Sequence, residues 1–253
     1  MTTYRAVIFD LGDTLLDLHG QDDRELFLHA SEASHRWMQQ QGVALPSLLR
    51  FRLEMVRSYL WSRLVGHWQY LETDAAELVT RVLRRMKVKL TDEQLRQLAF
   101  DFLDDYGETY SLFDGVIELL EDLGRAGIGR AILSNTVWTW DYMEHSIRDF
   151  GLHRVTDHRI YSADFGRKKP CPDIFRHALA KLGTRPSETI MVGNSYKRDA
   201  RGGKRVGLTT VWIDHSPGPP LRRPAADYPV ADATEMIETV RRLTGTQRSD
   251  ADN

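Results

Sequence analysis

One short segment near the N-terminus constrains the fold of this chain more than any other. Residues 6–9 form the apolar run Ala-Val-Ile-Phe, which ends at Asp10 and is followed by Leu-Gly-Asp-Thr. A β-branched and aromatic run of this kind predicts a buried strand over residues 4–10. Open α/β sheets place their chemistry at the carboxyl ends of parallel strands, and a carboxylate there costs free energy unless something uses it. The segment predicts an α/β fold and makes Asp10 a candidate functional residue.

The chain after position 114 alternates between strand and helix patterns. Gly151 and Gly183 mark the ends of two of the helices. This alternation predicts a parallel sheet with right-handed crossovers and helices on its faces. Strands are expected over residues 129–134, 159–162, 189–192 and 209–213, and helices over residues 116–123, 138–150, 173–182, 199–206 and 233–243.

The region between residues 22 and 110 differs in composition and in the spacing of its apolar residues. Glycine is rare there, Pro46 is the only proline, and apolar residues recur at helical spacing. Thr91-Asp92-Glu93-Gln94 resembles a helix start. The pattern predicts four or five packed helices. Trp37, Trp61 and Trp68 are expected in their core, with contact to a substrate as the alternative. Residues 1–18 and 111–253 are predicted to form the α/β core, and residues 19–110 a helical domain inserted after the first strand, where it can cover the site and exclude water.

Composition limits the classes of partner. The net charge is -2, so there is no electrostatic case for binding nucleic acid or an acidic membrane surface. Apolar runs are too short to span a bilayer, and the N-terminus lacks the layout of a secretory signal. The one cysteine, Cys171, forms no internal disulfide and suits a reducing compartment. A cytoplasmic protein is expected, with its oligomeric state left open.

Polar residues follow four of the predicted strands. They are Asp10 with Asp13 and Thr14, then Ser134-Asn135, then Lys169, then Asn194 with Asp199. Each one alone is more often a turn, cap or surface residue, but strand ends in a parallel sheet share one edge. There a carboxylate can attack an electrophile, Ser134 and Lys169 can hold an anionic group, and a second carboxylate at Asp199 favours Mg²⁺.

The ordered set of motifs resembles the haloacid dehalogenase superfamily of aspartate-nucleophile hydrolases, in the branch with a helical cap after the first strand. The resemblance implies a Rossmann-like parallel sheet core with an inserted all-helical cap domain. It also implies that Asp10 is the nucleophile, that Ser134 and Lys169 are catalytic, and that Thr14, Ser134, Asn135 and Lys169 bind substrate. Metal ligands by resemblance are Asp10, the Gly12 carbonyl, Asn194 and Asp199. The matching segments are residues 9–15, 132–135, 166–175 and 192–199.

Two positions depart from the pattern of the phosphatases in that superfamily. Gly12 stands where they carry a second aspartate, which protonates the leaving group, and Asn194 stands where many carry aspartate. General acid–base help of this kind is worth about 10²–10⁴-fold in rate. The dehalogenases also lack the second aspartate and need no metal, but they carry a bulky aromatic residue at that position.

The expected activity is Mg²⁺-dependent hydrolysis of a small phosphate monoester through an aspartyl-phosphate on Asp10. Two alternatives stay open at this point. One is a metal-independent hydrolase of the 2-haloacid dehalogenase type, and the other is a catalytically impaired member of the fold that binds a ligand or regulates.

Overall fold

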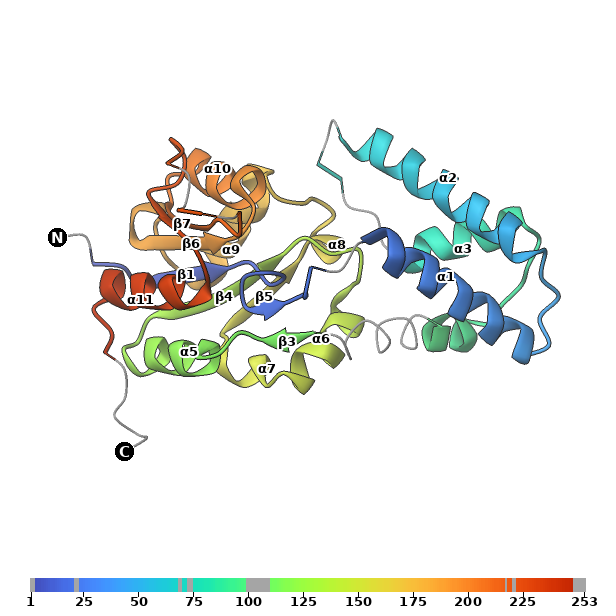
Figure 1. Ribbon diagram of the computed structural model, residues 1–253, viewed down its shortest axis with the longest axis horizontal. Coiled ribbons are helices and arrows are strands. Elements are labelled where there is room, and N and C mark those ends of the chain that lie inside the picture. The colour runs from blue at the N-terminus through green and yellow to red at the C-terminus, as the bar shows by residue number, and fades with distance from the viewer. Residues whose placement is uncertain are drawn as a thin grey trace.

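The computed structural model describes residues 3–20, 23–67, 70–71, 75–98, 110–216, 218–219 and 222–247. Its centre is a six-stranded sheet in the order β5-β4-β1-β6-β7-β8, and every neighbouring pair is parallel (Figure 1). This confirms the predicted Rossmann-like α/β core. The strands are β1 (Ala6–Phe9), β4 (Gly129–Ser134), β5 (His158–Tyr161), β6 (Thr189–Gly193), β7 (Thr209–Ile213) and β8 (Tyr228–Val230).

Helices cover both faces of the sheet, as a parallel sheet requires. Successive residues of β1 point to opposite faces, so Val7 and Phe9 join one apolar core and Ile8 joins the other. One face is covered by α5 (Val116–Arg125), α6 (Trp140–Asp149), α7 (Leu152–Val155) and α11 (Ala233–Thr244). The other is covered by α9 (Pro172–Leu182) and α10 (Arg201–Arg205), with the short α8 (Ser162–Phe165) after β5.

Three differences from the sequence analysis concern an edge strand and the starts of two helices. The edge strand β8 was not predicted, because it has only three residues and includes Pro229. Helix α6 begins at Trp140, since the chain from Asn135 to Thr139 forms a loop after β4. The helix expected over residues 199–206 starts earlier, as the π-turn η2 (Tyr196–Ala200), where Ser195 Oγ accepts from the Arg198 backbone N–H at 3.3 Å.

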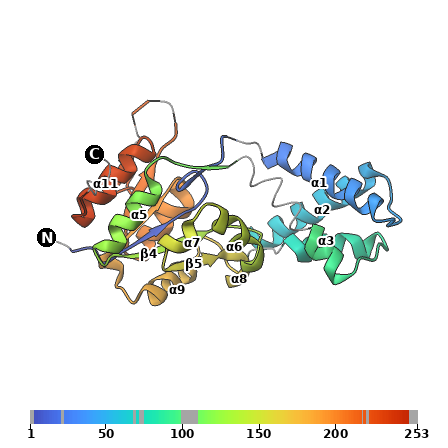
Figure 2. The same ribbon diagram turned by 90° about the horizontal axis from the view of Figure 1, so that it is seen from below.

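A separate group of helices lies between β1 and β4 in the chain. It contains α1 (Asp23–Gln40), α2 (Leu48–His67), α3 (Ala75–Arg85) and a helical turn at residues 92–98. The short strands β2 (Leu16–Asp17) and β3 (Ser111–Leu112) pair antiparallel where the chain leaves and re-enters the core. Figures 1 and 2 show these helices beside the sheet, beyond the end toward which β1 runs.

The helical insertion has its own apolar core, which includes Met38, Phe51 and Val82. The predicted helix start at Thr91 is confirmed: the Gln94 N–H donates to Thr91 Oγ1, and the Thr91 N–H donates to Gln94 Oε1. Trp37 packs against this core as predicted. The prediction for Trp61 was wrong, because its side chain is 59% exposed on α2. Trp68 lies outside the described residues.

None of the described helices is both long enough and apolar enough to cross a membrane.

Candidate active site

The register of three strands brings the predicted site segments to one edge of the sheet. Phe9 lies opposite Ile132 of β4 and Val192 of β6, so the residues that follow these strands leave the sheet together. The Asp10 N–H donates to the Val192 carbonyl at 2.9 Å, which extends the pairing of β1 with β6 by one residue. Asp10 and Asn194 therefore emerge side by side from adjacent strands.

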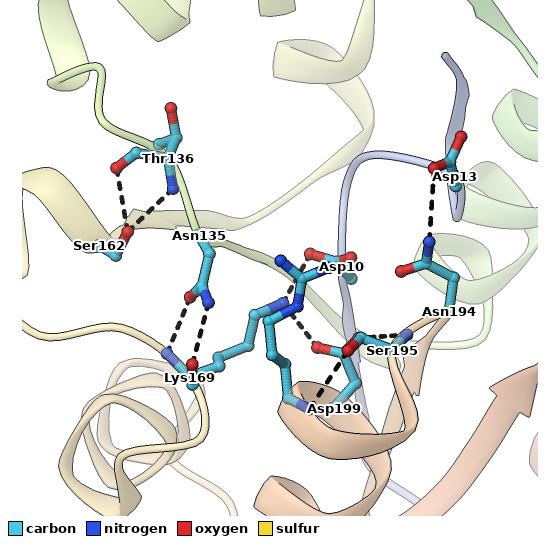
Figure 3. A network of polar contacts seen from close by, with 10 residues as sticks. Asp10, Asp13, Asn135, Thr136, Ser162, Lys169, Asn194, Ser195 and Asp199 are labelled. Atoms are coloured by element: carbon cyan, nitrogen blue, oxygen red, sulfur yellow. Dashed lines mark hydrogen bonds and ion pairs between the residues drawn. The ribbon is translucent and has the colours of Figure 1, made fainter. Parts of the chain in front are cut away.

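Lys169 joins the carboxylates of Asp10 and Asp199 in the cluster shown in Figure 3. Its ammonium donates to Asp10 Oδ1 at 2.6 Å and forms an ion pair with Asp199 Oδ1 at 2.8 Å. The side chains of Lys169 and Asp199 are each 1% exposed, whereas that of Asp10 is 12% exposed. Asp10 is therefore the member of the cluster that a substrate can reach, as a nucleophile must be.

Burial and the charges within the cluster shift the pKa values of Asp199 and Lys169. Burial raises the pKa of Asp199 to about 6; the Lys169 ammonium opposes this rise and the Asp10 charge adds to it. Burial disfavours the charged form of Lys169, but the charges of Asp10 and Asp199 outweigh it, so the pKa of Lys169 is raised. Lys169 therefore carries its positive charge at neutral pH and can neutralise an anion bound beside Asp10.

The backbone of Lys169 is fixed by the Asn135 side chain. Asn135 Oδ1 accepts from the Lys169 N–H at 2.8 Å, and Asn135 Nδ2 donates to the Lys169 carbonyl at 3.0 Å. Ser162 holds the next residue, Thr136, through a similar pair of hydrogen bonds (Figure 3). Both ends of the Asn135 amide thus position the loop that carries Lys169, and direct contact of Asn135 with a substrate stays a prediction.

The two carboxylate oxygens of Asp199 have different surroundings. Oδ2 accepts from the Ser195 backbone N–H at 2.9 Å, while Oδ1 forms the ion pair with Lys169 and has no hydrogen-bond partner among the described residues. Gly193 makes this approach possible, because a Cβ there would lie 2.5 Å from Asp199 Cγ. The role of Asp199 as a metal ligand stays a prediction, and in this arrangement it would require the carboxylate to share an oxygen with Lys169 or Ser195.

The turn after Asp10 directs Asp13 away from the Lys169 cluster. Asp13 has a left-handed backbone, with φ 52°. Its Oδ1 accepts from the Leu18 N–H at 3.2 Å, and its Oδ2 lies 3.5 Å from Asn194 Nδ2 (Figure 3). These contacts give Asp13 a structural role in the turn.

Two further predicted residues lie close to this edge without joining the ion cluster. Ser134 is the last residue of β4 and is buried, but no hydrogen bond among the described residues joins it to Asp10, Lys169 or Asp199. Thr14 is fully buried, and its Oγ1 has no hydrogen-bond partner in the described part of the chain. Substrate contacts for both residues stay predictions.

The candidate ligands for a hard cation beside Asp10 are mostly neutral oxygens. Asn194 Oδ1 is buried and lacks a hydrogen-bond partner within the described residues, so it is free to bind a cation. The described residues contain no group of three or more His, Cys, Asp or Glu side chains arranged to hold a metal. Mg²⁺ would be held by the Asp10 carboxylate with neutral oxygens from Gly12 and Asn194, a donor set that Mg²⁺ accepts.

Two contacts from the end of β7 were not predicted. Trp212 Nε1 donates to the Asn194 carbonyl at 2.9 Å, and His215 Nε2 donates to the Asp13 carbonyl at 2.8 Å. They fix the two loops that carry Asn194 and Gly12. No local pattern in the sequence indicates these contacts, because His215 and Asp13 are 202 positions apart.

Comparison with known proteins identifies the family of the chain. A family model for haloacid dehalogenase-like hydrolases matches residues 4–207. A phosphoserine phosphatase from Thermus thermophilus is 28% identical over 195 residues, which cover 71% of this chain and 77% of that protein. A glyceraldehyde 3-phosphate phosphatase from Pyrococcus furiosus is 25% identical over 257 residues and 98% of each chain.

The fold is also similar to that of a solved 2-haloacid dehalogenase from Pseudomonas syringae pv. Tomato. The TM-score is 0.67 at 20% identity, and the match covers 95% of this chain and 99% of that one. At this identity the likeness concerns the fold. With the family model matching most of the chain and the motif residues gathered at one sheet edge, the chain belongs to the haloacid dehalogenase-like hydrolases.

Proposed function

We propose that this hydrolase is a Mg²⁺-dependent phosphatase that cleaves small phosphate monoesters through an aspartyl-phosphate on Asp10. The observation that carries the proposal is the buried ion cluster, in which Lys169 holds the partly exposed Asp10 beside the partnerless oxygen of Asn194. Support for the substrate class comes from the two relatives, which are named for phosphoserine and glyceraldehyde 3-phosphate.

In this mechanism an Asp10 oxygen attacks phosphorus in line, and the P–O bond to the leaving alkoxide breaks. The alkoxide takes its proton from a water molecule, because Gly12 offers no acid. Lys169 neutralises charge on the phosphoryl oxygens, and Ser134 donates a hydrogen bond to one of them. Mg²⁺, held by Asp10, Gly12 and Asn194 with Asp199 nearby, would supply further charge stabilisation. Water then cleaves the acyl-phosphate, which regenerates Asp10. Residues 19–110 act as a cap over the core formed by residues 1–18 and 111–253, and exclude bulk water during the transfer.

A dehalogenase is the second candidate, and Gly12 is the observation that favours it, because carbon–halogen cleavage needs no acid at that position. A panel of phosphate monoesters and 2-haloacids, each assayed with Mg²⁺ and with a chelator, separates the candidates. Phosphate release that requires Mg²⁺ supports the phosphatase, and chelator-insensitive halide release supports the dehalogenase. Absence of turnover with both classes would point to a binding or regulatory role and would contradict the proposal.

Restoring the missing acid should accelerate phosphate release. A Cβ at Gly12 would lie 2.9 Å from Leu18 Cδ1, the end of a flexible side chain that can move aside. Gly12→Asp should therefore be tolerated and raise kcat by about 10²-fold, the lower end of the usual benefit of a general acid. Gly12→Asn is the matched control, since it has the same shape without the proton. Equal rates for the two variants would exclude acid catalysis from this position.

Adding a charge at Asn194 should strengthen the binding of Mg²⁺. Asn194→Asp places an anionic oxygen where the buried amide oxygen now lies, and we expect roughly tenfold tighter Mg²⁺ binding by calorimetry. The new carboxylate also faces Asp13, whose Oδ2 is 3.5 Å from the present amide nitrogen. Without Mg²⁺ the variant should therefore melt at a lower temperature than the parent, and Mg²⁺ should reverse the loss. An unchanged Mg²⁺ affinity would show that residue 194 does not bind the metal.

A further inference from the structure

The outer face of α2 carries an unusual concentration of exposed apolar side chains. Among the described residues, six large hydrophobic side chains are exposed, and five of them belong to this helix. They are Leu49 (69%), Leu53 (60%), Val56 (39%), Leu60 (59%) and Trp61 (59%). Soluble monomers rarely expose a contiguous patch of this kind unless it binds something.

Helical spacing places four of these residues on one line. Leu49, Leu53, Val56 and Leu60 follow each other at intervals of four, three and four positions, which is the spacing of a packing seam. The opposite face of α2 holds Phe51 and Met55, which are buried in the core of the insertion. Figure 1 shows α2 along the outer side of the insertion, with α1 and α3 both on its other side.

We propose that this stripe, residues 49, 53, 56 and 60 with Trp61, is the interface through which two copies of the chain associate. The exposed part of the five side chains amounts to roughly 350 Å² of apolar area, taking about 100 Å² for an aliphatic and about 200 Å² for an aromatic side chain. A stable dimer buries about 800 Å² on each partner, of which about 65% is apolar. The stripe therefore supplies about two thirds of the apolar area that such an interface needs.

The order of residues along α2 suits a twofold axis between antiparallel helices. If the axis passes between Leu53 and Val56, Leu53 faces the partner's Val56, and Leu49 faces the partner's Leu60. The apolar stripe is therefore complementary to its own reverse, which is the requirement of an isologous interface.

Charged residues along one side of the stripe come near residues of opposite charge or aromatic character when the same twofold axis is applied. Glu54 and Arg57 lie on one side and form an intrahelical ion pair at 3.6 Å, with the Arg57 side chain 72% exposed. When the helix is reversed against a copy of itself, Glu54 comes near the partner's Arg57, and Arg50 comes near the partner's Trp61. Two ion pairs and two cation–π contacts then flank the apolar seam. This complementarity favours a second copy over a different partner.

Analytical ultracentrifugation of the full chain, over a range of micromolar concentrations, tests the interface. We expect a reversible dimer for the parent. Leu53→Asp should raise the dimer dissociation constant at least 30-fold, because the symmetry places the charge in the seam twice. Leu60→Asp should have a similar effect, and Arg84→Glu on α3 is the matched control that should leave the dimer intact. A parent that stays monomeric, or a dimer that persists in Leu53→Asp, would overturn the proposal.

A charge exchange tests the antiparallel arrangement. In Arg57→Glu, the new carboxylate lies near the partner's Glu54 at both symmetry-related places. The like charges should weaken the dimer about tenfold. The double variant Glu54→Arg/Arg57→Glu restores opposite charges and should recover the parental dissociation constant. Failure of the double variant to recover it would rule out the proposed pairing. Circular dichroism confirms that each variant is folded, and the result is independent of the reaction that the enzyme catalyses.

Discussion

Asp10→Asn should reduce turnover at least about 10⁴-fold on the best substrate of the panel. The amide has the size of the carboxylate, but it lacks the anionic oxygen that attacks phosphorus, and loss of a nucleophile typically costs several orders of magnitude. Asp10 follows β1 directly, and its backbone N–H pairs with Val192, so the position itself should not move. The measurement is kcat under saturating Mg²⁺, with a thermal melt to show that the variant is folded.

Asp13→Asn is the matched control for this experiment. It makes the same chemical change three residues later, at a side chain that accepts from the Leu18 N–H and lies beside Asn194. We expect Asp13→Asn to lower stability by about 1.5–3 kcal/mol, the usual value for a hydrogen bond to a charged group, and to keep turnover within about tenfold. If Asp13→Asn were inactive and Asp10→Asn active, Asp10 would not be the nucleophile.

Lys169→Met should destabilise the protein by about 3–5 kcal/mol at pH 7, the usual cost of removing one partner from a buried ion pair. The substitution keeps a side chain of similar length and leaves the Asp10 and Asp199 carboxylates facing each other without a cation. Phosphate release should also fall sharply, since no ammonium then stabilises the transferred group. Urea denaturation and kcat measure the two effects.

The loss of stability in Lys169→Met should depend on pH with a definite sign. Burial already raises the pKa of Asp199 to about 6 with Lys169 present, and removal of Lys169 takes away an influence that lowers it. A carboxyl group whose pKa in the folded state lies above its unfolded value of 3.8 stabilises the folded state at pH values below 3.8. This stabilisation is lost as the pH rises through the pKa of the folded state. The variant should therefore be closer to the parent at pH 5 than at pH 8.

Two companion variants make the Lys169 experiment specific. Lys168→Met changes the neighbouring lysine and should leave stability within about 1 kcal/mol of the parent. Lys169→Met/Asp199→Asn removes the second buried charge as well, and should recover a large part of the stability lost by Lys169→Met. It should not recover turnover. A double variant as unstable as the single one would show that packing, rather than charge, is the reason for the loss.

Much of the local structure could be predicted from sequence patterns. The apolar run before Asp10, the helix ends at Gly151 and Gly183 and the capping residues Thr91 and Gln94 all have the predicted structure. These signals depend on residues a few positions apart, so the chain carries them wherever the rest of the protein lies. The same patterns could not show which of the two apolar faces of α2 is buried and which is exposed. Spacing indicates which residues share a face, and only the neighbouring helices decide which face is covered.

The sequence by itself determined the order of five of the six strands in the main sheet and of the longer helices between them, and the chemical groups that follow these strands. Tertiary structure alone decided that β1 lies between β4 and β6, and that Lys169 reaches Asp10 across 159 positions. It also decided that Asp199 faces Lys169 and the Ser195 N–H, and that Trp212 and His215 hold the loops of Asn194 and Asp13. The physical reason is that backbone preferences act between near neighbours in the chain, whereas ion pairs and buried hydrogen bonds depend on which distant segments pack together.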